Sequence, residues 1–487
     1  MKNDASEPNK WIVFSFVAAG VFISTLDGSI VNIVLPAIMA DLHVSMDTIE
    51  WVQLIYLLIL SSTLLSFGRL SDIKGRRRLY VLGMIIFSVG SLFCGLSETA
   101  FWLILFRGVQ GIGAAMIMSC TPALLIETFP AAERGRALGT IGAVVASGLT
   151  LGPCLGGIIT QKFSWQMIFF VNIPIGIITS VSANRILKGG KTDVRKEEPF
   201  DLPGAVLIVC FLAPLLYSAT SAYKTGYTSW PTLFFFSLSL VSFAALILLE
   251  SKSEYPVIDL ALLRIRLFIL PAIAGVIAFA ALFTMIFLMP FYLMHPCGLS
   301  INQAGWVMIT PFAMLFIFSP ISGALSDRIG SRFLCTLGMV ILMVALFFLS
   351  RIPSDADIFS IIWPLALAGI GTAVFISPNS SITMSAVPLN RKGVAAGTVA
   401  TARNLGMILG IAAAATIFNT VFFEMSGGLT LKIYRPELEQ VFMKSYSAAM
   451  TAGAVIASIG VVISFLRGPE DDLREKILED DAENNRP

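Results

Sequence analysis

Charge is scarce in this sequence. Only 13% of its 487 residues are charged, whereas a soluble globular domain carries about 25%, and 56% of them are hydrophobic. Such a chain lacks the polar side chains to face water on all sides, and its apolar content also excludes intrinsic disorder. The net charge of +2 gives no indication of a nucleic-acid partner. The composition therefore predicts a polytopic membrane protein whose main partner is the lipid bilayer.

Residues typical of metal and hydrolase sites are also scarce. The two histidines, His43 and His295, lie in predicted loops, and no His-Glu-x-x-His or Gly-x-Ser-x-Gly motif is present. Gly190-Lys191-Thr192 resembles the end of a phosphate-binding loop, but the earlier glycine of that loop is replaced by Arg185. The six cysteines are scattered and show no disulfide pattern. We therefore expect a protein that is not an enzyme or an ATP-driven pump and that holds no metal ion or cofactor.

Long apolar runs dominate the chain. A helix needs about 20 apolar residues to cross roughly 30 Å of hydrocarbon. Fourteen runs approach or exceed this length, near 11–36, 49–68, 79–97, 101–125, 136–159, 165–187, 203–219, 232–249, 268–294, 304–324, 333–350, 358–385, 393–423 and 444–467. The seventh and eighth are the shortest. The runs predict an all-α membrane protein with fourteen transmembrane helices.

The positions of lysine and arginine test this count. With the N-terminus inside, the cytoplasmic segments hold 25 of the 33 basic residues and the outer loops hold six. This bias is what the positive-inside rule predicts, so both termini are expected in the cytoplasm of a protein of the inner (plasma) membrane. The remaining two, Arg107 and Arg403, fall inside spans.

An internal repeat divides the chain. The segment 68–77, which follows the second span, recurs at 323–332 after the tenth, and glycines of the fifth span recur in the thirteenth. Each step covers eight helices, so a six-helix unit leaves two additional helices between the halves, and the short seventh and eighth spans are the candidates. The predicted units are a six-helix bundle (1–187), a cytoplasmic linker with two additional helices (188–267), a second six-helix bundle (268–467) and an acidic cytoplasmic tail (468–487).

Four motifs in order carry a family resemblance. They are Leu26-Asp27 through Pro36 in the first span, 68–78 after the second, Arg107-Gly-Val-Gln110-Gly111 in the fourth and 148–157 in the fifth. Together they resemble the major facilitator superfamily, in its 14-helix branch of drug:proton antiporters. The resemblance implies two six-helix bundles plus two extra helices. It also implies multidrug efflux, in which amphipathic drugs or toxic small molecules are exported by alternating access. A proton gradient would be the energy source.

Alternatives within the same fold stay open. A facilitator or a proton symporter for a metabolite would share most of these motifs, although the motif of the fifth span favours antiport. We expect the transporter to act as a monomer on a small-molecule substrate and protons. Relatives in double-membrane bacteria can pair with a periplasmic adaptor, and no motif here identifies one.

Asp27 is the sharpest feature of the first span. It lies about nine residues, or roughly 13 Å, from the outer end of its helix, and Arg107 lies roughly 9 Å from the outer end of the fourth. A carboxylate at this depth costs about 2.5–3.5 kcal/mol unless it has a partner, water or a proton. Two interpretations follow: a static Asp–Arg pair that fixes two helices, or a proton-exchanging Asp27 tuned by Arg107. The resemblance likewise implicates this pair in proton coupling.

Two glycine-containing motifs have a structural and a functional interpretation. Positive-inside anchoring explains the arginines after the second span. It explains neither the acid nor the glycines, which suit a tight turn with close backbone approach. The resemblance implies a cytoplasmic gate formed by Gly68, Asp72, Gly75, Arg76, Arg77, Asp327 and Arg332. Close helix packing explains the glycines of the fifth span. The resemblance adds a hinge and proton seal at Gly148, Gly152, Pro153, Gly156 and Gly157.

A substrate cavity is expected between the halves. An arginine near the middle of a span should face a cavity or a carboxylate, and aromatic side chains can line an apolar pocket. The candidate lining residues are Asn32, Tyr56, Gln110, Phe283, Phe287, Phe312, Asn379, Arg403 and Asn404. Spans 9–14 contain no acid near mid-depth, which argues for neutral, monocationic or anionic amphipathic substrates.

Overall fold

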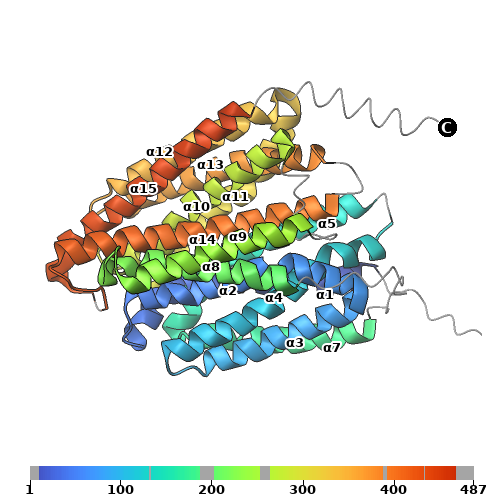
Figure 1. Ribbon diagram of the computed structural model, residues 1–487, viewed down its shortest axis with the longest axis horizontal. Coiled ribbons are helices and arrows are strands. Elements are labelled where there is room, and N and C mark those ends of the chain that lie inside the picture. The colour runs from blue at the N-terminus through green and yellow to red at the C-terminus, as the bar shows by residue number, and fades with distance from the viewer. Residues whose placement is uncertain are drawn as a thin grey trace, which may run out of the picture.

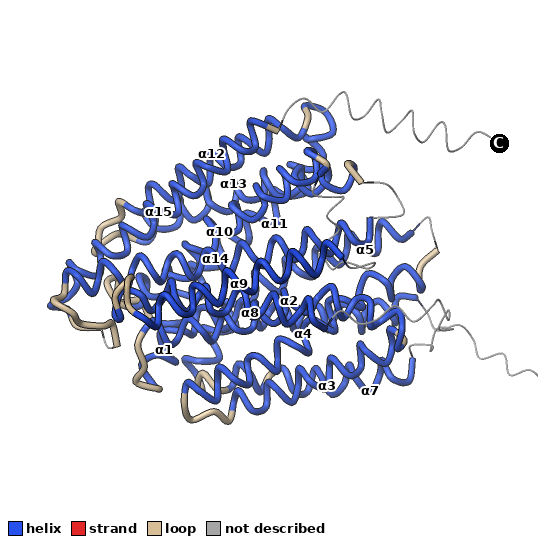
Figure 2. The backbone as a smooth tube through the Cα atoms, in the orientation of Figure 1, coloured by secondary structure: helices blue, strands red, loops and turns tan. Residues whose placement is uncertain are grey.

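The structure is a computed structural model that describes residues 10–130, 133–186, 202–252, 264–387, 392–432 and 434–467. Every regular element within these ranges is a helix, as Figure 2 shows. Among the described residues, fourteen helical spans are long and apolar enough to cross a membrane. This confirms the predicted all-helical fold with fourteen transmembrane helices. The acidic tail at 468–487 lies outside the described residues.

The first six spans are built from seven helices. They are α1 (Lys10–Asp41), α2 (Met46–Lys74), α3 (Arg76–Gly95), α4 (Ala100–Thr128), α5 (Arg134–Lys162), α6 (Met167–Phe170) and α7 (Asn172–Ile186). The last two form one span that is interrupted at Val171. The predicted runs are recovered because each is bounded by charged or Gly/Pro-containing segments that end the apolar stretch.

The remaining eight spans follow in the same alternating order. They are α8 (Leu202–Thr225), α9 (Trp230–Lys252), α10 (Arg266–Met294), α11 (Ile301–Ile329), α12 (Ser331–Ser350), α13 (Ile358–Ser385), α14 (Lys392–Met425) and α15 (Glu439–Leu466), with a short 3-10 helix at Pro436–Leu438. α8 and α9, at 24 and 23 residues, are not the shortest, because α3 and α12 have 20. The sequence underestimated α8 and α9, since their helices continue beyond the strictly apolar run.

The first helix begins and the last helix ends on the same side of the molecule. The Met46 amide donates to the Leu431 carbonyl at 3.2 Å, which joins the α1–α2 loop to the α14–α15 loop. The first residue of α1 and the last residue of α15 therefore both lie at the other end of the molecule. We call the end at which α1 begins and α15 ends the terminal end, and the opposite end the far end.

The repeat in the sequence is a repeat in the structure. Gly75 joins α2 to α3 at a φ of 94°, and Gly330 joins α11 to α12 at a φ of 84°. This region favours glycine because a side chain would clash there. α5 packs on α1 through Gly148 and Gly152, and α14 packs on α10 through the corresponding Gly406 and Gly410. Figure 1 shows α3 and α7 at one edge and α12 and α15 at the other.

The hairpin of α8 and α9 lies against both halves. Its two helices pack on each other, and α8 also contacts α2 and α14. At the far end, Lys224 Nζ lies 2.7 Å from a carboxylate oxygen of Asp47, and Tyr223 donates to the other oxygen at 3.2 Å. α9 exposes large apolar side chains such as Trp230 and Val241, as expected for a helix that faces lipid. Where the chain divides into domains stays a prediction.

Candidate functional site

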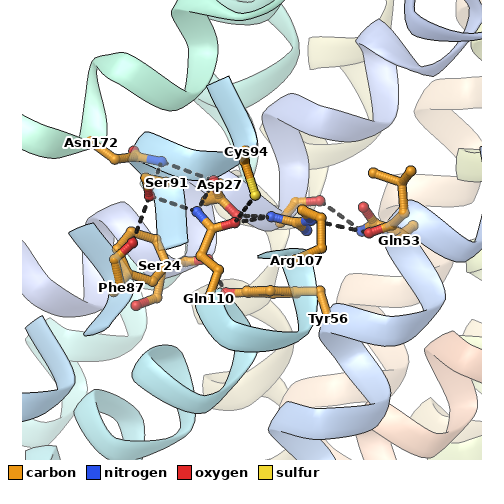
Figure 3. Close-up of polar contacts among 12 residues, drawn as sticks. Ser24, Asp27, Gln53, Tyr56, Phe87, Ser91, Cys94, Arg107, Gln110 and Asn172 are labelled. Carbon is orange, nitrogen blue, oxygen red and sulfur yellow. Dashed lines mark hydrogen bonds and ion pairs between the residues drawn. The ribbon is translucent and has the colours of Figure 1, made fainter. Parts of the chain in front are cut away.

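Asp27 lies in a buried polar cluster within the first half. Its side chain is fully buried and forms an ion pair with Arg107, which is also fully buried. The second carboxylate oxygen accepts from Gln110 Nε2 at 2.8 Å and from Asn172 Nδ2 at 2.9 Å. Figure 3 shows these side chains pointing toward one another from α1, α4 and α7. Asp27 and Arg107, which the sequence places at similar depths, are therefore in direct contact in the structure.

Arg107 is held from several directions. Its Nε donates to the Val52 carbonyl on α2 at 3.0 Å, and Nη1 donates to Gln110 Oε1 at 2.7 Å. The guanidinium lies over the ring of Tyr56, 4.2 Å from the centroid, in a cation–π contact. Nη2 is buried and has no hydrogen-bond partner among the described residues. Arg107 is therefore fixed in place, and among the described residues Asp27 is the acid that forms an ion pair with it.

Two members of this cluster were missed in the sequence. Asn172 begins α7 directly after the interruption of the sixth span, and Ser91 on α3 accepts from Gln110 Nε2 at 2.8 Å. The signal for Asn172 is an amide side chain in an apolar run, two residues before Pro174. Ser91 gives no such signal, because serine commonly bonds its own helix backbone in membrane spans.

A thin wall separates this cluster from the space between the two halves. Tyr56 donates to the Ser24 carbonyl at 3.0 Å, and Gln53 Nε2 donates to the Gly28 carbonyl at 2.8 Å. These four residues line the central cavity, whereas Asp27 lies one residue from Gly28 and faces the other way. Asp27 and Arg107 therefore lie against the cavity wall through α1 and the Tyr56 ring.

The central cavity has a volume of about 970 Å³, at the upper end of the range for small-molecule sites. Side chains of α1, α2, α4, α5, α10, α11, α13 and α14 line it. Seven of the nine predicted lining residues do so: Asn32, Tyr56, Phe283, Phe312, Asn379, Arg403 and Asn404. Further aromatic rings come from Phe279, Phe316 and Phe375. The cavity is thus mostly apolar and aromatic, with a few polar groups.

Two residues predicted to line the cavity lie elsewhere. Gln110 is on the face of α4 that carries Arg107, three residues earlier, and this face points to Asp27 rather than between the halves. Phe287 is fully buried and lies beyond Ile286, the last α10 residue of the lining. The rotation of α4 turns Gln110 away from the cavity, and the depth at which the halves close leaves Phe287 outside it.

The cavity extends to the terminal end and is closed toward the far end. Its lining begins at Pro271 on α10 and Ala396 on α14, five and four residues after the first residue of each helix. Toward the far end, Asn32 Nδ2 donates to the Ile286 carbonyl at 2.6 Å and joins α1 to α10. The two halves therefore meet at the far-end side of the cavity.

The glycine motif of α5 makes two tight helix contacts. A Cβ atom on Gly152 would lie 2.5 Å from Ser29 Oγ, and one on Gly156 would lie 2.7 Å from a methyl carbon of Ile33. Gly157 instead faces α11, where a Cβ would lie 2.7 Å from the Ile301 carbonyl oxygen. Gly148 packs on Thr25 in the same way, and Pro153 lies inside the helix. The close packing is shown, and the roles as hinge and seal stay predictions.

The motif after α2 and its repeat after α11 form turns, hydrogen bonds and an ion pair at the terminal end. Arg76 lies 2.8 Å from a carboxylate oxygen of Glu127 on α4, and Arg77 donates to the side-chain oxygen of Asn184 on α7 at 3.0 Å. In the second half, Arg332 Nε donates to the Phe465 carbonyl at 2.9 Å. Each of these contacts joins residues of the same half, and none of them crosses between the halves.

Not every gate residue behaves as predicted. Gly68 lies inside α2, and no described atom outside its own helix backbone would lie within 4 Å of a Cβ added there, so it makes neither a turn nor a close approach. The helix simply continues for another turn after the apolar run ends. The side chains of Asp72 and Asp327 lie outside the described residues, and the gate role of the motif stays a prediction.

Chemically, the site offers a buried acid next to a cavity. The Asp27 carboxylate is held by one cation and two amide donors, so its hydrogen bonds depend on its charge. Among the described residues, no group of three or more His, Cys, Asp or Glu side chains is placed to hold a metal ion.

Comparisons with known proteins agree with this arrangement. The family model of the Major Facilitator Superfamily matches residues 17–411. The riboflavin transporter RibZ of Clostridioides difficile is 34% identical over 94% of this chain and 98% of its own. The multidrug resistance protein Stp of Mycobacterium tuberculosis is 33% identical over 81% of this chain and 73% of its own. The fold resembles an inward-facing bacterial homologue of the lysosomal transporter Spinster, with a TM-score of 0.64, 16% identity and coverage of 95% and 98%.

Proposed function

The chain belongs to the Major Facilitator Superfamily of transporters, and from this premise we propose that it exports amphipathic small molecules in exchange for protons. The exporter works by alternating access across the inner membrane, with both termini in the cytoplasm. It acts as a monomer and needs no cofactor beyond the proton gradient. In this orientation the terminal end is cytoplasmic and the cavity faces inward.

The observation that carries the proposal is the position of Asp27 relative to the cavity. Asp27 and Gly28 are adjacent in α1, yet one faces the Arg107 cluster and the other lines the cavity. Protonation of Asp27 would remove the charge that balances Arg107 and would release the pull of the cluster on α1. A carrier needs such a difference between its two states in order to couple proton and substrate.

The driving force is adequate for export. One charge that crosses the membrane is worth about 2.3 kcal/mol per 100 mV, and a pH gradient adds about 1.4 kcal/mol per unit. The relative named as a multidrug resistance protein supports export of drug-like compounds.

A second candidate function is transport of a metabolite such as riboflavin. The relative named as a riboflavin transporter matches nearly the whole of both chains, and the aromatic cavity of about 970 Å³ has room for a tricyclic ring system. A metabolite symporter or facilitator would use the same fold and cavity, so direction and coupling separate the two candidates.

The test uses everted membrane vesicles with an acidic lumen and a pH-sensitive dye. Riboflavin, fluorescein, rhodamine 123 and a panel of drugs are added in turn. An antiporter moves substrate inward and protons outward, so a transported compound raises the lumenal pH. A symporter instead accumulates substrate in right-side-out vesicles with an acidic exterior, and a facilitator responds to neither gradient.

The matched variants separate coupling from protein loss. Asp27→Asn is expected to abolish the pH response, whereas Asp355→Asn, in an exposed far-end loop, is expected to leave it unchanged. Substrate-dependent proton release by Asp27→Asn at the wild-type rate would overturn the proposed coupling.

A further inference from the structure

Arg403 sets the charge of the substrate cavity. Its side chain, on α14, is partly exposed to the cavity. Among the cavity-lining residues that the structure describes, Arg403 is the single charged one, and no aspartate, glutamate, lysine or histidine accompanies it. The cavity therefore has a positive potential at a depth where no carboxylate of the described wall offsets it.

Arg403 also lacks a partner in the part of the chain that the structure describes. No hydrogen bond or ion pair to it occurs within the described residues, and its Nε is buried with its hydrogen unpaired. Arg107 makes the contrast clear, since it has a carboxylate, an amide and a carbonyl as acceptors. An unpaired guanidinium in a low-dielectric site is unfavourable unless a ligand or water completes it.

Most other polar groups of the cavity are already satisfied. Asn32 donates to the Ile286 carbonyl, and Asn379 donates to the Pro271 carbonyl at 3.0 Å. Tyr56 and Gln53 donate to carbonyls of α1. The donors that remain for a ligand are the Arg403 guanidinium, the Asn404 amide beside it and the hydroxyls of Ser319, Ser377 and Ser380. Of these, only the guanidinium is charged and suited to bidentate binding of a carboxylate or sulfonate.

The rest of the wall favours a planar aromatic ligand. Phe279, Phe283, Phe312 and Phe316 line the cavity from α10 and α11. Rings of this kind bury aromatic surface and add edge or stacking contacts.

We propose that this transporter selects aromatic organic anions, whose carboxylate or sulfonate pairs with Arg403 while the ring system packs among the phenylalanines. The inference rests on the proposed transport function and names its substrate class. A cationic compound of the same shape would meet an unpaired arginine and find no carboxylate in the described wall, so it is disfavoured by like-charge repulsion.

The test compares two dyes that share one tricyclic ring system and differ in charge. Fluorescein is an anion at neutral pH and rhodamine 123 is a cation. Binding of each to purified protein in lipid nanodiscs is measured by fluorescence anisotropy. We expect fluorescein to bind at least roughly tenfold more tightly than rhodamine 123, because a hydrogen-bonded charge pair is worth roughly a 10- to 100-fold change in affinity.

Variants assign this preference to Arg403. Arg403→Gln is expected to weaken fluorescein binding roughly 10- to 100-fold and to leave rhodamine 123 binding unchanged or improved, with Arg403→Lys intermediate. Arg435→Gln, in an exposed far-end loop, is the matched control. Fluorescein should also raise the thermal stability of the wild type and not that of Arg403→Gln. The melting curve of Arg403→Gln in this experiment also shows that the variant is folded.

The outcomes for substrate class and for coupling are separable. Failure of fluorescein to bind, equal or tighter binding of rhodamine 123, or unchanged fluorescein affinity in Arg403→Gln overturns the anion inference. Fluorescein binding without any pH-driven movement in vesicles supports that inference and overturns proton-coupled export. Proton-driven export of rhodamine 123 but not of fluorescein supports proton-coupled export and overturns the anion inference.

Discussion

Replacing Asp27 distinguishes a proton-coupling acid from a static helix clamp. In the folded protein Asp27 pairs with Arg107 and accepts from Gln110 at 2.8 Å and Asn172 at 2.9 Å. In Asp27→Asn the carbonyl can still accept from Arg107, but the new amide faces two amide donors. Arg107 is then a buried cation without a counter-charge, which costs about 3–5 kcal/mol. We therefore expect a folded but clearly destabilised protein.

The double variant Asp27→Asn/Arg107→Gln separates the two roles. It removes the uncompensated cation, so thermal unfolding should return toward the wild type and recover much of the about 3–5 kcal/mol. Proton-coupled export should not return, because neither position can then titrate. Substrate exchange between equal concentrations on the two sides, which needs no net proton movement, should persist.

Two assays read these effects. Thermal unfolding of purified protein reports the pair, and pH-driven transport in everted vesicles reports the coupling. A double variant no more stable than the single one would refute the argument about the buried cation. A double variant that exports with normal proton coupling would refute the role of Asp27 and leave the static clamp as the explanation.

Two further predictions concern the far end. Gly305→Ala would push a Cβ into the Pro153 carbonyl, so α5 and α11 should separate, and spin-label distances between the loops after α5 and α10 should lengthen. Gly108→Ala, whose Cβ would meet its nearest atom at 3.5 Å, should leave them unchanged. Burial lowers the pKa of His295, next to Tyr434, from 6.5 to about 4, so the unfolded chain binds its proton first. Stability should therefore fall as the pH drops from about 6.5 to about 4, and a thermal melt of His295→Phe should show a smaller loss.

The span count and the repeat were predicted because they depend on one-dimensional properties. Apolar run length fixes where a helix can cross, and basic residues mark one face of the membrane. The paired depth of Asp27 and Arg107 is likewise a matter of counting 1.5 Å per residue along two antiparallel helices. No knowledge of neighbouring helices is needed for any of these.

Which side chains face the cavity, in contrast, depends on the rotation of each helix about its axis. Gln110 and Phe287 sit at suitable depths for the cavity, yet one turns toward Asp27 and the other lies beyond the point at which the halves meet. Asn172 enters the cluster from the first residue of α7, directly after the interruption of the sixth span at Val171. Sequence periodicity is weak in helices that are apolar all round, so it does not report these rotations.

The sequence alone thus determined a fourteen-helix transporter fold with scarce intramembrane charges, since hydropathy and charge are written residue by residue. Only the tertiary structure decided how those charges are used. It pairs Arg107 with Asp27 behind the cavity wall and gives Arg403, inside the cavity, no partner among the described residues. The physical reason is that the energy and the role of a buried charge depend on its neighbours in space. Helix packing sets those neighbours, because it brings together residues that lie far apart in the chain.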